Sequence, residues 1–138
     1  MRLTQEIDYA FRIVAYLAKN EEKVAGAPLI AAELKVPERF TLRILRKLNL
    51  AGITQAKRGA HGGYLLKKDK EDISLYDIIL AIDGPIIINR CLHVEEPFCS
   101  REEDRPISRC KFHHRLHNIQ KDIVQQFEES KITDFIEQ

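Results

Sequence analysis

Two short helical segments joined by a tight turn, with a glycine-rich hairpin directly after them, restrict the possible folds of this chain most strongly. Pro28 suits the first turn of a helix over about 28–34, because the N–H that proline lacks is not needed there. The turn 35–37 follows, and a second helix covers about 38–51 with Gly52 as its C-terminal cap. Two helices joined by so short a turn predict a helix-turn-helix.

A basic, glycine-rich segment follows the second helix and separates two short runs with strand character. The runs are 53–56 and 64–67, and the segment 57–63 between them has the sequence Lys-Arg-Gly-Ala-His-Gly-Gly. Because glycine permits the backbone conformations of a tight turn, this pattern predicts an antiparallel β-hairpin with a flexible, positively charged tip. Such a hairpin is the wing of a winged helix-turn-helix.

Apolar spacing and capping residues predict further helices. An amphipathic helix covers 5–19, with Thr4 as its N-cap. Ser74 and Asp77 have the spacing of a capping box and begin a helix that ends near Ile82.

The last predicted helix, 110–129, has an extended apolar seam. Its apolar residues are spaced 4, 3, 4 and 4 positions apart: Phe112, Leu116, Ile119, Ile123 and Phe127. A helix of this length, far from the N-terminal core, is expected to pack on a twin subunit. The predicted fold is therefore mainly α with a small β-hairpin. It comprises a winged helix-turn-helix domain at 1–85, a cysteine-bearing sensor loop at 86–109, and a dimerisation helix with its tail at 110–138.

Charge is distributed unevenly along the chain. Residues 1–70 carry 14 Lys and Arg against 7 Asp and Glu, whereas residues 71–138 carry 8 against 14. The segment 39–68 contains eight basic residues and no acidic one. A solvated surface normally mixes both signs, so a long segment of one sign indicates a polyanionic partner.

Double-stranded DNA is the polyanion that this arrangement fits. A helix that enters the major groove needs a second helix to hold it and cations to meet the phosphates. We expect the arginines of 38–51 at phosphates or guanine edges, and Arg58 in a minor groove. The predicted DNA contacts are Arg39, Thr41, Arg43, Arg46, Lys47, Arg58, Gly59 and His61. The plainer interpretation is that the arginines only solubilise the helix. RNA is disfavoured because no aromatic stacking platform is evident.

Short motifs occur in order along nearly the whole chain. They are Met1-Arg2-Leu3-Thr4, Asp8-Tyr9-Ala10, Arg58-Gly59-Ala60-His61-Gly62-Gly63-Tyr64, Ile82-Asp83-Gly84-Pro85 and Ile132-Thr133. Together they resemble the IscR/NsrR family of winged-helix repressors, and the Arg-Gly-x-x-Gly-Gly-Tyr wing is the most specific of them. The resemblance implies a homodimer with a long dimerisation helix that binds partly palindromic promoter sites. One reading-helix position that is often glutamate in the family is Leu42 here, so the family's operator does not carry over.

The three cysteines, Cys91, Cys99 and Cys110, lie in one polar stretch, separated by seven and ten residues. An odd number in a chain without a secretory signal argues against a disulfide framework. Structural thiols normally lie among apolar residues, which these neighbours are not. Thiolates close in sequence are the ligands that iron–sulfur clusters prefer, and the resemblance implies a cluster of the 2Fe–2S or 4Fe–4S type. Zinc, or a reversible Cys99–Cys110 disulfide, is the alternative.

A fourth ligand is needed, and the sequence offers two candidates. Asp8 matches, within its Asp-Tyr-Ala motif, the aspartate that nitric-oxide-sensing members of the family contribute from the partner subunit. Without that role, Asp8 would form an i,i+4 ion pair with Arg12. His113 lies three residues after Cys110, so both face the same side of a helix, as in members with three cysteines and one histidine. We favour Asp8 on the sequence alone.

The sequence therefore predicts a homodimeric transcription regulator, a repressor, whose operator affinity is switched by the cluster in response to nitric oxide, redox state or cluster supply. The alternative is a cluster-free regulator with a thiol switch or a small effector. We expect no catalysis, since neither a phosphate-binding loop nor a metalloprotease histidine pair occurs. A chain without a signal peptide or a long apolar run is expected in the cytoplasm.

Overall fold

The first helix begins at the residue whose side chain caps it. The Thr4 hydroxyl accepts a hydrogen bond from the Ile7 N–H at 3.3 Å, and helix α1 (Gln5–Lys19) follows. Glu6 and Asp8 lie in the first turn, where acidic side chains favour the positive end of the helix dipole. The predicted helix and its cap are confirmed. The computed structural model describes residues 2–101, 103 and 105–136.

The predicted helix-turn-helix is present as α2 (Ala27–Leu34) and α3 (Glu38–Leu50). Lys35 ends α2 in the left-handed conformation with φ of 55°, and buried Val36 lies in the turn that follows. Gly52 has φ of 78° just beyond α3, a conformation that glycine adopts without steric cost. Lys35 thus begins the turn between the two helices, and Gly52 ends the second of them.

The wing is an antiparallel hairpin of β1 (Thr54–Lys57) and β2 (Gly63–Leu66), offset by one residue from each predicted strand. Tyr64 also exchanges two backbone hydrogen bonds with Ala25, at 2.7 and 3.0 Å. Ala25 lies in the connection between α1 and α2, so the wing is attached to the body of the domain as well as to α3.

Helix α4 (Leu75–Asp83) begins with the predicted capping box. The Asp77 N–H donates to the Ser74 hydroxyl at 3.0 Å, and the Ser74 N–H donates to the Asp77 carboxylate at 2.9 Å. Lys68, at the end of the wing, donates to the same carboxylate at 3.2 Å. Gly84, with φ of 80°, ends the helix.

Replacing Asp77 with alanine is expected to lower the free energy of unfolding by about 1–2 kcal/mol, because a cap and an ion pair are lost together. Burial would raise the pKa of Asp77, but the Ser74 N–H and the Lys68 ammonium outweigh it and lower that pKa. A depressed pKa stabilises the fold above the unfolded value of about 3.9, and this contribution disappears as the pH falls through the folded-state pKa. Denaturant titrations should therefore show a full difference at neutral pH that shrinks below about pH 4.

The matched control for this variant is Asp72→Ala, which removes an exposed carboxylate nearby. We expect its effect to stay within about 0.5 kcal/mol. Equal losses in the two variants at neutral pH would show that the capping box does not contribute as described.

One hydrophobic core unites the N-terminal helices with a segment from the far end of the chain. Its buried members come from α1, α2, α3, α4, the residues that flank the wing, and Ile132. Ile132 begins η4 (Ile132–Phe135), is 1% exposed, and donates its N–H to the Ile73 carbonyl at 2.8 Å. The C-terminal segment therefore returns to the winged-helix core after the last helix, which the sequence patterns did not indicate.

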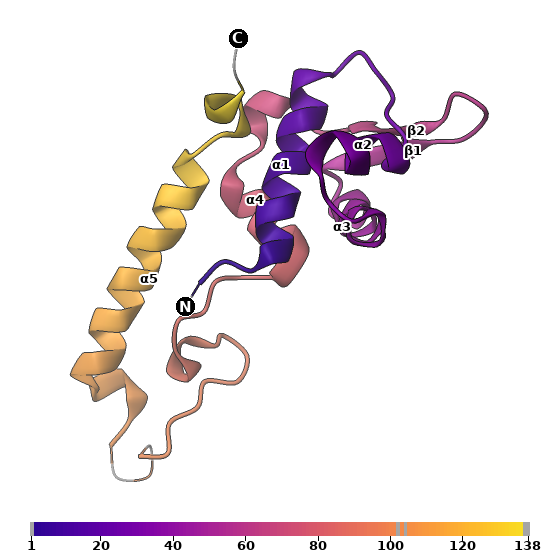
Figure 1. Ribbon diagram of the computed structural model, residues 1–138. Coiled ribbons are helices and arrows are strands. Elements are labelled where there is room, and N and C mark those ends of the chain that lie inside the picture. Colours follow the sequence, from indigo (N-terminus) through magenta and orange to yellow (C-terminus); the bar gives the residue numbers. More distant parts are fainter. Residues whose placement is uncertain (1, 102, 104, 137–138) are drawn as a thin grey trace.

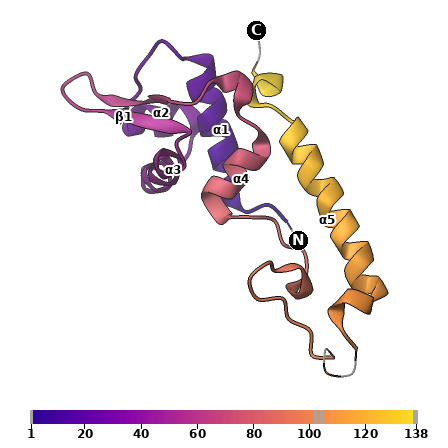
Figure 2. The same ribbon diagram turned by 180° about the vertical axis from the view of Figure 1, so that it is seen from behind.

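Helix α5 (Lys111–Glu129) forms an arm that runs beside α4 and extends beyond the body, on the side opposite the wing (Figures 1 and 2). None of its residues, all of which the structure describes, is buried, although its apolar seam is that of a packed helix. No helix within the described part of the chain is long and apolar enough to cross a membrane.

The segment that connects α4 to α5 lies beside the outer end of the arm (Figure 1). It contains two 3-10 turns, η2 (Arg90–Leu92) and η3 (Ile107–Arg109); a third, η1 (Lys70–Asp72), precedes α4. The Gln120 side chain of α5 accepts a hydrogen bond from the Ile88 N–H at 2.9 Å. This contact holds the start of the connecting segment against α5.

Candidate DNA-binding face and cysteine cavity

An open groove separates α3 from the wing, and basic side chains line it. Arg39, Arg43 and Arg46 are all exposed on α3. The groove is lined by Arg39, Leu42, Arg43, Arg46, Asn49, Leu50 and Tyr64. Leu50 is 85% exposed, an unusual position for a large apolar side chain. The face combines cations with apolar surface, which suits contact with phosphates and base methyl groups.

Thr41 does not lie on this face. Its side chain is fully buried, and its hydroxyl donates to the Pro37 carbonyl at 3.2 Å. The neighbouring Phe40 is 40% exposed instead and packs edge-on against Tyr9. We therefore leave Thr41 out of the proposed DNA contacts.

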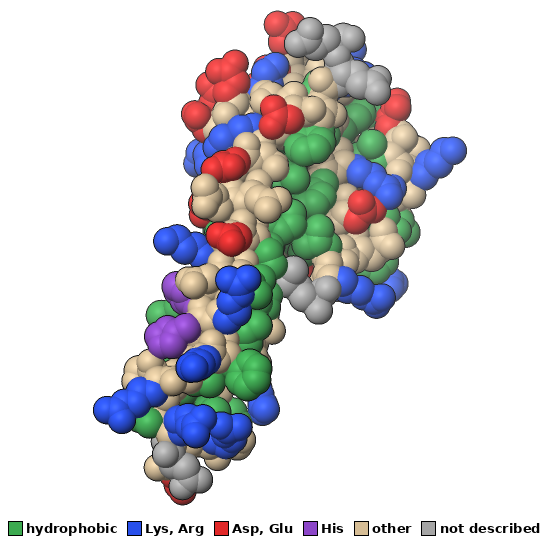
Figure 3. All heavy atoms as spheres, turned by 90° about the vertical axis from the view of Figure 1, so that its left-hand side faces the viewer, with side chains coloured by type: hydrophobic (Ala, Val, Ile, Leu, Met, Phe, Trp, Pro, Cys, Tyr) green, Lys and Arg blue, Asp and Glu red, His purple; other side chains and the backbone are tan. Residues whose placement is uncertain are grey.

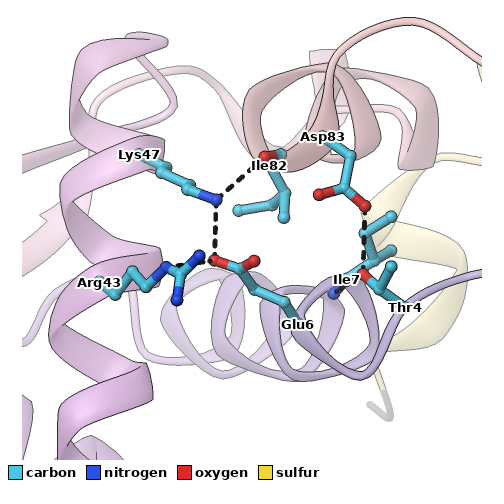
Figure 4. Close-up of polar contacts among 7 residues, drawn as sticks. All are labelled: Thr4, Glu6, Ile7, Arg43, Lys47, Ile82 and Asp83. Carbon is cyan, nitrogen blue, oxygen red and sulfur yellow. Dashed lines mark hydrogen bonds and ion pairs between the residues drawn. The ribbon is translucent and has the colours of Figure 1, made fainter.

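Lys47 is also engaged within the protein. Its ammonium lies 2.9 Å from the Glu6 carboxylate and donates to the Ile82 carbonyl at 3.1 Å (Figure 4). Arg43 contacts the same carboxylate at 3.4 Å but keeps 62% of its side chain exposed. The sequence assigned Lys47 to DNA and did not indicate its ion pair with Glu6, because the contact between α1 and α3 is tertiary.

The tip of the wing carries the other predicted DNA contacts. Arg58, Gly59 and His61 are all exposed. Gly59 has φ of 108°, and its carbonyl accepts a hydrogen bond from the Gly62 N–H at 2.9 Å. The glycines therefore form a tight turn that presents the Arg58 and His61 side chains to solvent.

All three cysteines line one cavity of about 320 Å³ between the connecting segment and α5. They are free thiols, each partly exposed. The other lining residues are Asn89, Arg90, Phe98, Ser100, Arg101, Arg105, Ile107, Phe112, His113 and Leu116. The sequence predicted that these cysteines act together, and the fold brings them to the same cavity.

Polar and cationic side chains surround this cavity. The Asn89 amide donates to the Cys91 sulfur at 3.7 Å. The Arg90 guanidinium lies 5.0 Å from the centre of the Phe98 ring, and Arg101 and Arg105 complete a cationic rim. The cavity rim is therefore basic.

His113 has an unusual environment within the cavity wall. Its Nδ1 atom is buried and has no hydrogen-bond partner among the described residues. The neighbouring His114 is different, since its Nε2 atom contacts the Ser108 carbonyl at 2.6 Å. A buried ring nitrogen without a partner is costly unless a ligand or water satisfies it. Because His113 also lines the cysteine cavity, it is part of the candidate site.

Asp8, the other candidate for fourth ligand, lies elsewhere in the same chain. Its carboxylate contacts Arg12 at 2.6 Å and accepts a hydrogen bond from Gln5 at 3.3 Å. It is absent from the described residues that line the cysteine cavity. Asp8 could reach a cysteine cavity only by coming from a second subunit.

The cavity donors do not converge on one point. Within the described parts of the chain, no three His, Cys, Asp or Glu side chains form a group that could hold a single metal ion. An iron–sulfur cluster is larger than a single ion, and its ligands bind different iron atoms. Such ligands need to line the same cavity but need not meet at one point.

The Rrf2 family model, described as an iron-dependent transcriptional regulator, matches residues 3–138. The chain belongs to the Rrf2 family. Protein aau3 of Rhizobium meliloti is 34% identical over 99 residues, which cover 72% of this chain and 64% of aau3. The HTH-type transcriptional regulator CymR of Bacillus subtilis is 32% identical over 98 residues, which cover 70% of this chain and 71% of CymR.

Solved structures of Rrf2-type regulators share the fold. The structure of CymR, the global cysteine regulator of B. subtilis, has a TM-score of 0.73 at 24% identity, with 98% of this chain and 95% of CymR covered. T. potens IscR has a TM-score of 0.70 at 20% identity, with 98% and 85% covered. The predicted winged-helix fold and the predicted family are confirmed. The chain is thus a transcription regulator of the Rrf2 family, a family of regulators rather than enzymes.

Proposed function

We propose that this Rrf2 protein is a homodimeric, cytoplasmic DNA-binding repressor whose operator affinity depends on an iron–sulfur cluster held by Cys91, Cys99 and Cys110. The observation that carries the proposal is the shared cavity, which is lined by three free thiols and by His113, whose Nδ1 is buried without a partner among the described residues. The family description as iron-dependent supports iron as the metal.

The residues of the cavity fit an iron–sulfur cluster. Thiolate sulfur and imidazole nitrogen are both ligands that iron in such clusters accepts. The amide of Asn89 donates toward sulfur, and the arginine rim offsets the negative charge that several thiolates bring. We propose His113 as the fourth ligand in place of Asp8, because it lines the same cavity and its buried Nδ1 lacks a partner in the described part of the chain.

Reading of DNA is proposed for α3 and the wing. With α3 in the major groove, Arg39, Arg43 and Arg46 face the DNA, and Arg58 at the wing tip reaches an adjacent minor groove. Gly59 and His61 would contact the DNA next to Arg58. Two such heads on one dimer account for a partly palindromic site, since half-site symmetry mirrors subunit symmetry.

Dimerisation is proposed for the apolar seam of α5. Figure 3 shows hydrophobic side chains in a band along the arm, between charged ones. Phe112 is 76% exposed and Ile119 is 37% exposed, although both belong to the seam. Exposed apolar area on a long helix is stabilised when a second copy covers it. The chain thus divides into a reading head at 1–85, a sensor loop at 86–109 and a dimerisation arm at 110–138.

The connection between sensor and reading head follows from chain topology. The sensor loop begins just beyond Gly84 at the end of α4 and ends at Cys110, which caps α5. Ordering this loop therefore sets how the arm sits on the head. A bound cluster would react with nitric oxide or oxidants. It would be absent when cluster supply fails. Release of the cysteines would relax the loop and change the spacing of the two heads.

A cluster-free thiol switch is the second candidate function. Cys99 and Cys110 line the same cavity as free thiols, and the relative CymR is a regulator of cysteine. A two-electron oxidant such as a peroxide would join these two thiols in a disulfide, taking up their two electrons and two protons, and the bond would order the same loop.

Anaerobic purification of the full chain tests the choice between these functions. We expect visible absorbance, iron and acid-labile sulfide, together with sequence-dependent binding to a duplex selected from a random-sequence library. Affinity that changes on cluster removal supports the proposal. Protein without iron or sulfide whose binding responds to reductant would replace the cluster with the thiol switch.

Replacing His113 with alanine is expected to accelerate the loss of iron to a chelator by roughly tenfold or more. Removing a group that surrounds a metal site weakens metal binding by about this factor. Alanine at His117, an exposed residue of the same helix, should have no effect and serves as the matched control. Asp8→Asn should also retain iron at the wild-type rate. Rapid loss in Asp8→Asn with normal retention in His113→Ala would instead assign the fourth ligand to the partner subunit's N-terminal helix.

A further inference from the structure

A charged cluster joins α3 to α1 and α4, two of the helices on which it packs (Figure 4). We call it the Glu6 cluster; it consists of Glu6, Arg43, Lys47 and the Ile82 carbonyl. Lys47 donates to that carbonyl at 3.1 Å and lies 2.9 Å from Glu6 Oε1, while Arg43 Nε lies 3.4 Å from the same oxygen. Neither Glu6 nor the Ile82 carbonyl is among the groups proposed to contact DNA.

Burial makes Glu6 dependent on these partners. Its side chain is only 14% exposed, and Oε1 is buried with contacts that are ion pairs outside hydrogen-bond geometry. A charge removed from water is costly unless opposite charges remain close to it. The Glu6 carboxylate therefore favours the one placement of α3 that keeps both cations beside it.

The Ile82 carbonyl also stabilises the inward position of the Lys47 side chain. It lies in the last turn of α4, where carbonyls lack helical partners and carry the negative end of the helix dipole. The same end of α4 is tied to α1 by the Thr4 hydroxyl, which donates to Asp83 at 3.1 Å. Lys47 thus connects α3 to α1 and α4 at one point.

We propose that Glu6 is a positioning residue for DNA reading. Through Lys47 it fixes the orientation of α3 on α1 and α4, and it shares Arg43 with the DNA phosphates. Lys47 is then a structural cation and not a DNA contact. This inference rests on the proposed function, in which α3 reads DNA. Because the carboxylate lowers the positive charge of the reading face, it also weakens binding to unspecific sequence.

Salt dependence separates a positioning cation from a cation that binds phosphate. Removing one phosphate-binding cation reduces the slope of log affinity against log salt by about 0.9. Lys47→Met should therefore weaken binding to a selected duplex by about tenfold, the usual effect of losing one side-chain interaction. It should leave the salt slope unchanged. Arg46→Met is the matched control on the exposed face of α3, and its slope should fall by about 0.9 per subunit.

Glu6→Gln tests the carboxylate itself. With Arg43 and Lys47 released, a scrambled duplex of the same composition should bind more tightly and with a steeper salt slope, by about 0.9 for each additional phosphate that the protein neutralises. The ratio of selected to scrambled affinity should fall about tenfold. The double variant Glu6→Gln, Lys47→Met should recover part of this ratio, because Lys47 is no longer present to bind the phosphates of the scrambled duplex.

The outcomes distinguish this inference from the proposed function. If Arg46→Met leaves the salt slope unchanged, α3 does not face DNA and the proposed function fails. If Arg46→Met lowers the slope and Lys47→Met lowers it equally, Lys47 binds phosphate and the positioning role is overturned. A fall in affinity for both duplexes in Glu6→Gln, without a change in their ratio, would overturn it as well, since general loss of folding acts on both.

Discussion

Alanine in place of Cys91, Cys99 or Cys110 is expected to reduce iron and acid-labile sulfide to background and to make operator affinity independent of cluster loading. Each thiol lines the same cavity, and removing one ligand leaves a cluster that the remaining donors hold weakly. In the wild type, loading should change the affinity for a selected duplex by about 5- to 150-fold, the usual range of coupling between two sites. In the variants this difference should vanish. The measurement is anaerobic metal analysis followed by titration with labelled duplex.

Ser100→Ala is the matched control for the cysteine variants. Ser100 lines the same cavity and follows Cys99 directly, but its hydroxyl is not a ligand that iron–sulfur clusters prefer. It should retain iron and its response to loading. Wild-type iron content in all three cysteine variants would remove the cavity from the sensing mechanism. If the wild type contains no iron and its operator affinity is still regulated, the thiol switch accounts for the result.

Gly63→Ala is expected to weaken DNA binding about tenfold or more and to lower the melting temperature by at least about 5 °C. Gly63 has φ of 154°, and a Cβ there would lie 2.6 Å from the carbonyl carbon and oxygen of Ala25. The added methyl must separate the wing from the α1–α2 connection and break the two hydrogen bonds between Ala25 and Tyr64. Strain of about 1–3 kcal/mol and the loss of two bonds of about 1 kcal/mol each account for the size of the effect.

The matched control for Gly63 is its spatial neighbour Gly26. A Cβ at Gly26 meets only the Pro28 ring at 3.7 Å, and this residue is the N-cap of α2. Gly26→Ser should be neutral or slightly stabilising, since serine caps helices well. Thermal unfolding and duplex titration of both variants measure the difference. A Gly63→Ala protein as stable as wild type would show that the wing does not need this close approach.

The candidate site divides into parts that local sequence could and could not predict. The cysteines were found because three thiols stood together in polar surroundings, which needs no tertiary information. The position of His113 relative to Cys110 was also visible, as a spacing of three along a helix. That His113 lines the cysteine cavity while Asp8 does not was not visible, because it depends on how the connecting segment folds against α5.

The DNA-binding face shows the same division. A charge pattern places Arg39, Arg43 and Arg46 on the solvent side of α3, where the structure has them. It also predicted contacts for Thr41, which is buried, and for Lys47, which α1 and α4 bind. Residue type and helical spacing do not reveal which side of a helix packs against its neighbours, so they could not predict the burial of Thr41 or the contacts of Lys47.

The sequence by itself determined the helix-turn-helix, the wing, and the capped starts of α1 and α4. These features depend on residues close together in the chain, such as Thr4 with Ile7 or Ser74 with Asp77, whose hydrogen bonds form locally. Only the tertiary structure decided the wing's attachment at Ala25, the return of Ile132 to the core, and the capture of Lys47 by Glu6. Each of these joins residues far apart in the chain. Their contacts become favourable only after the hydrophobic core has brought the segments together.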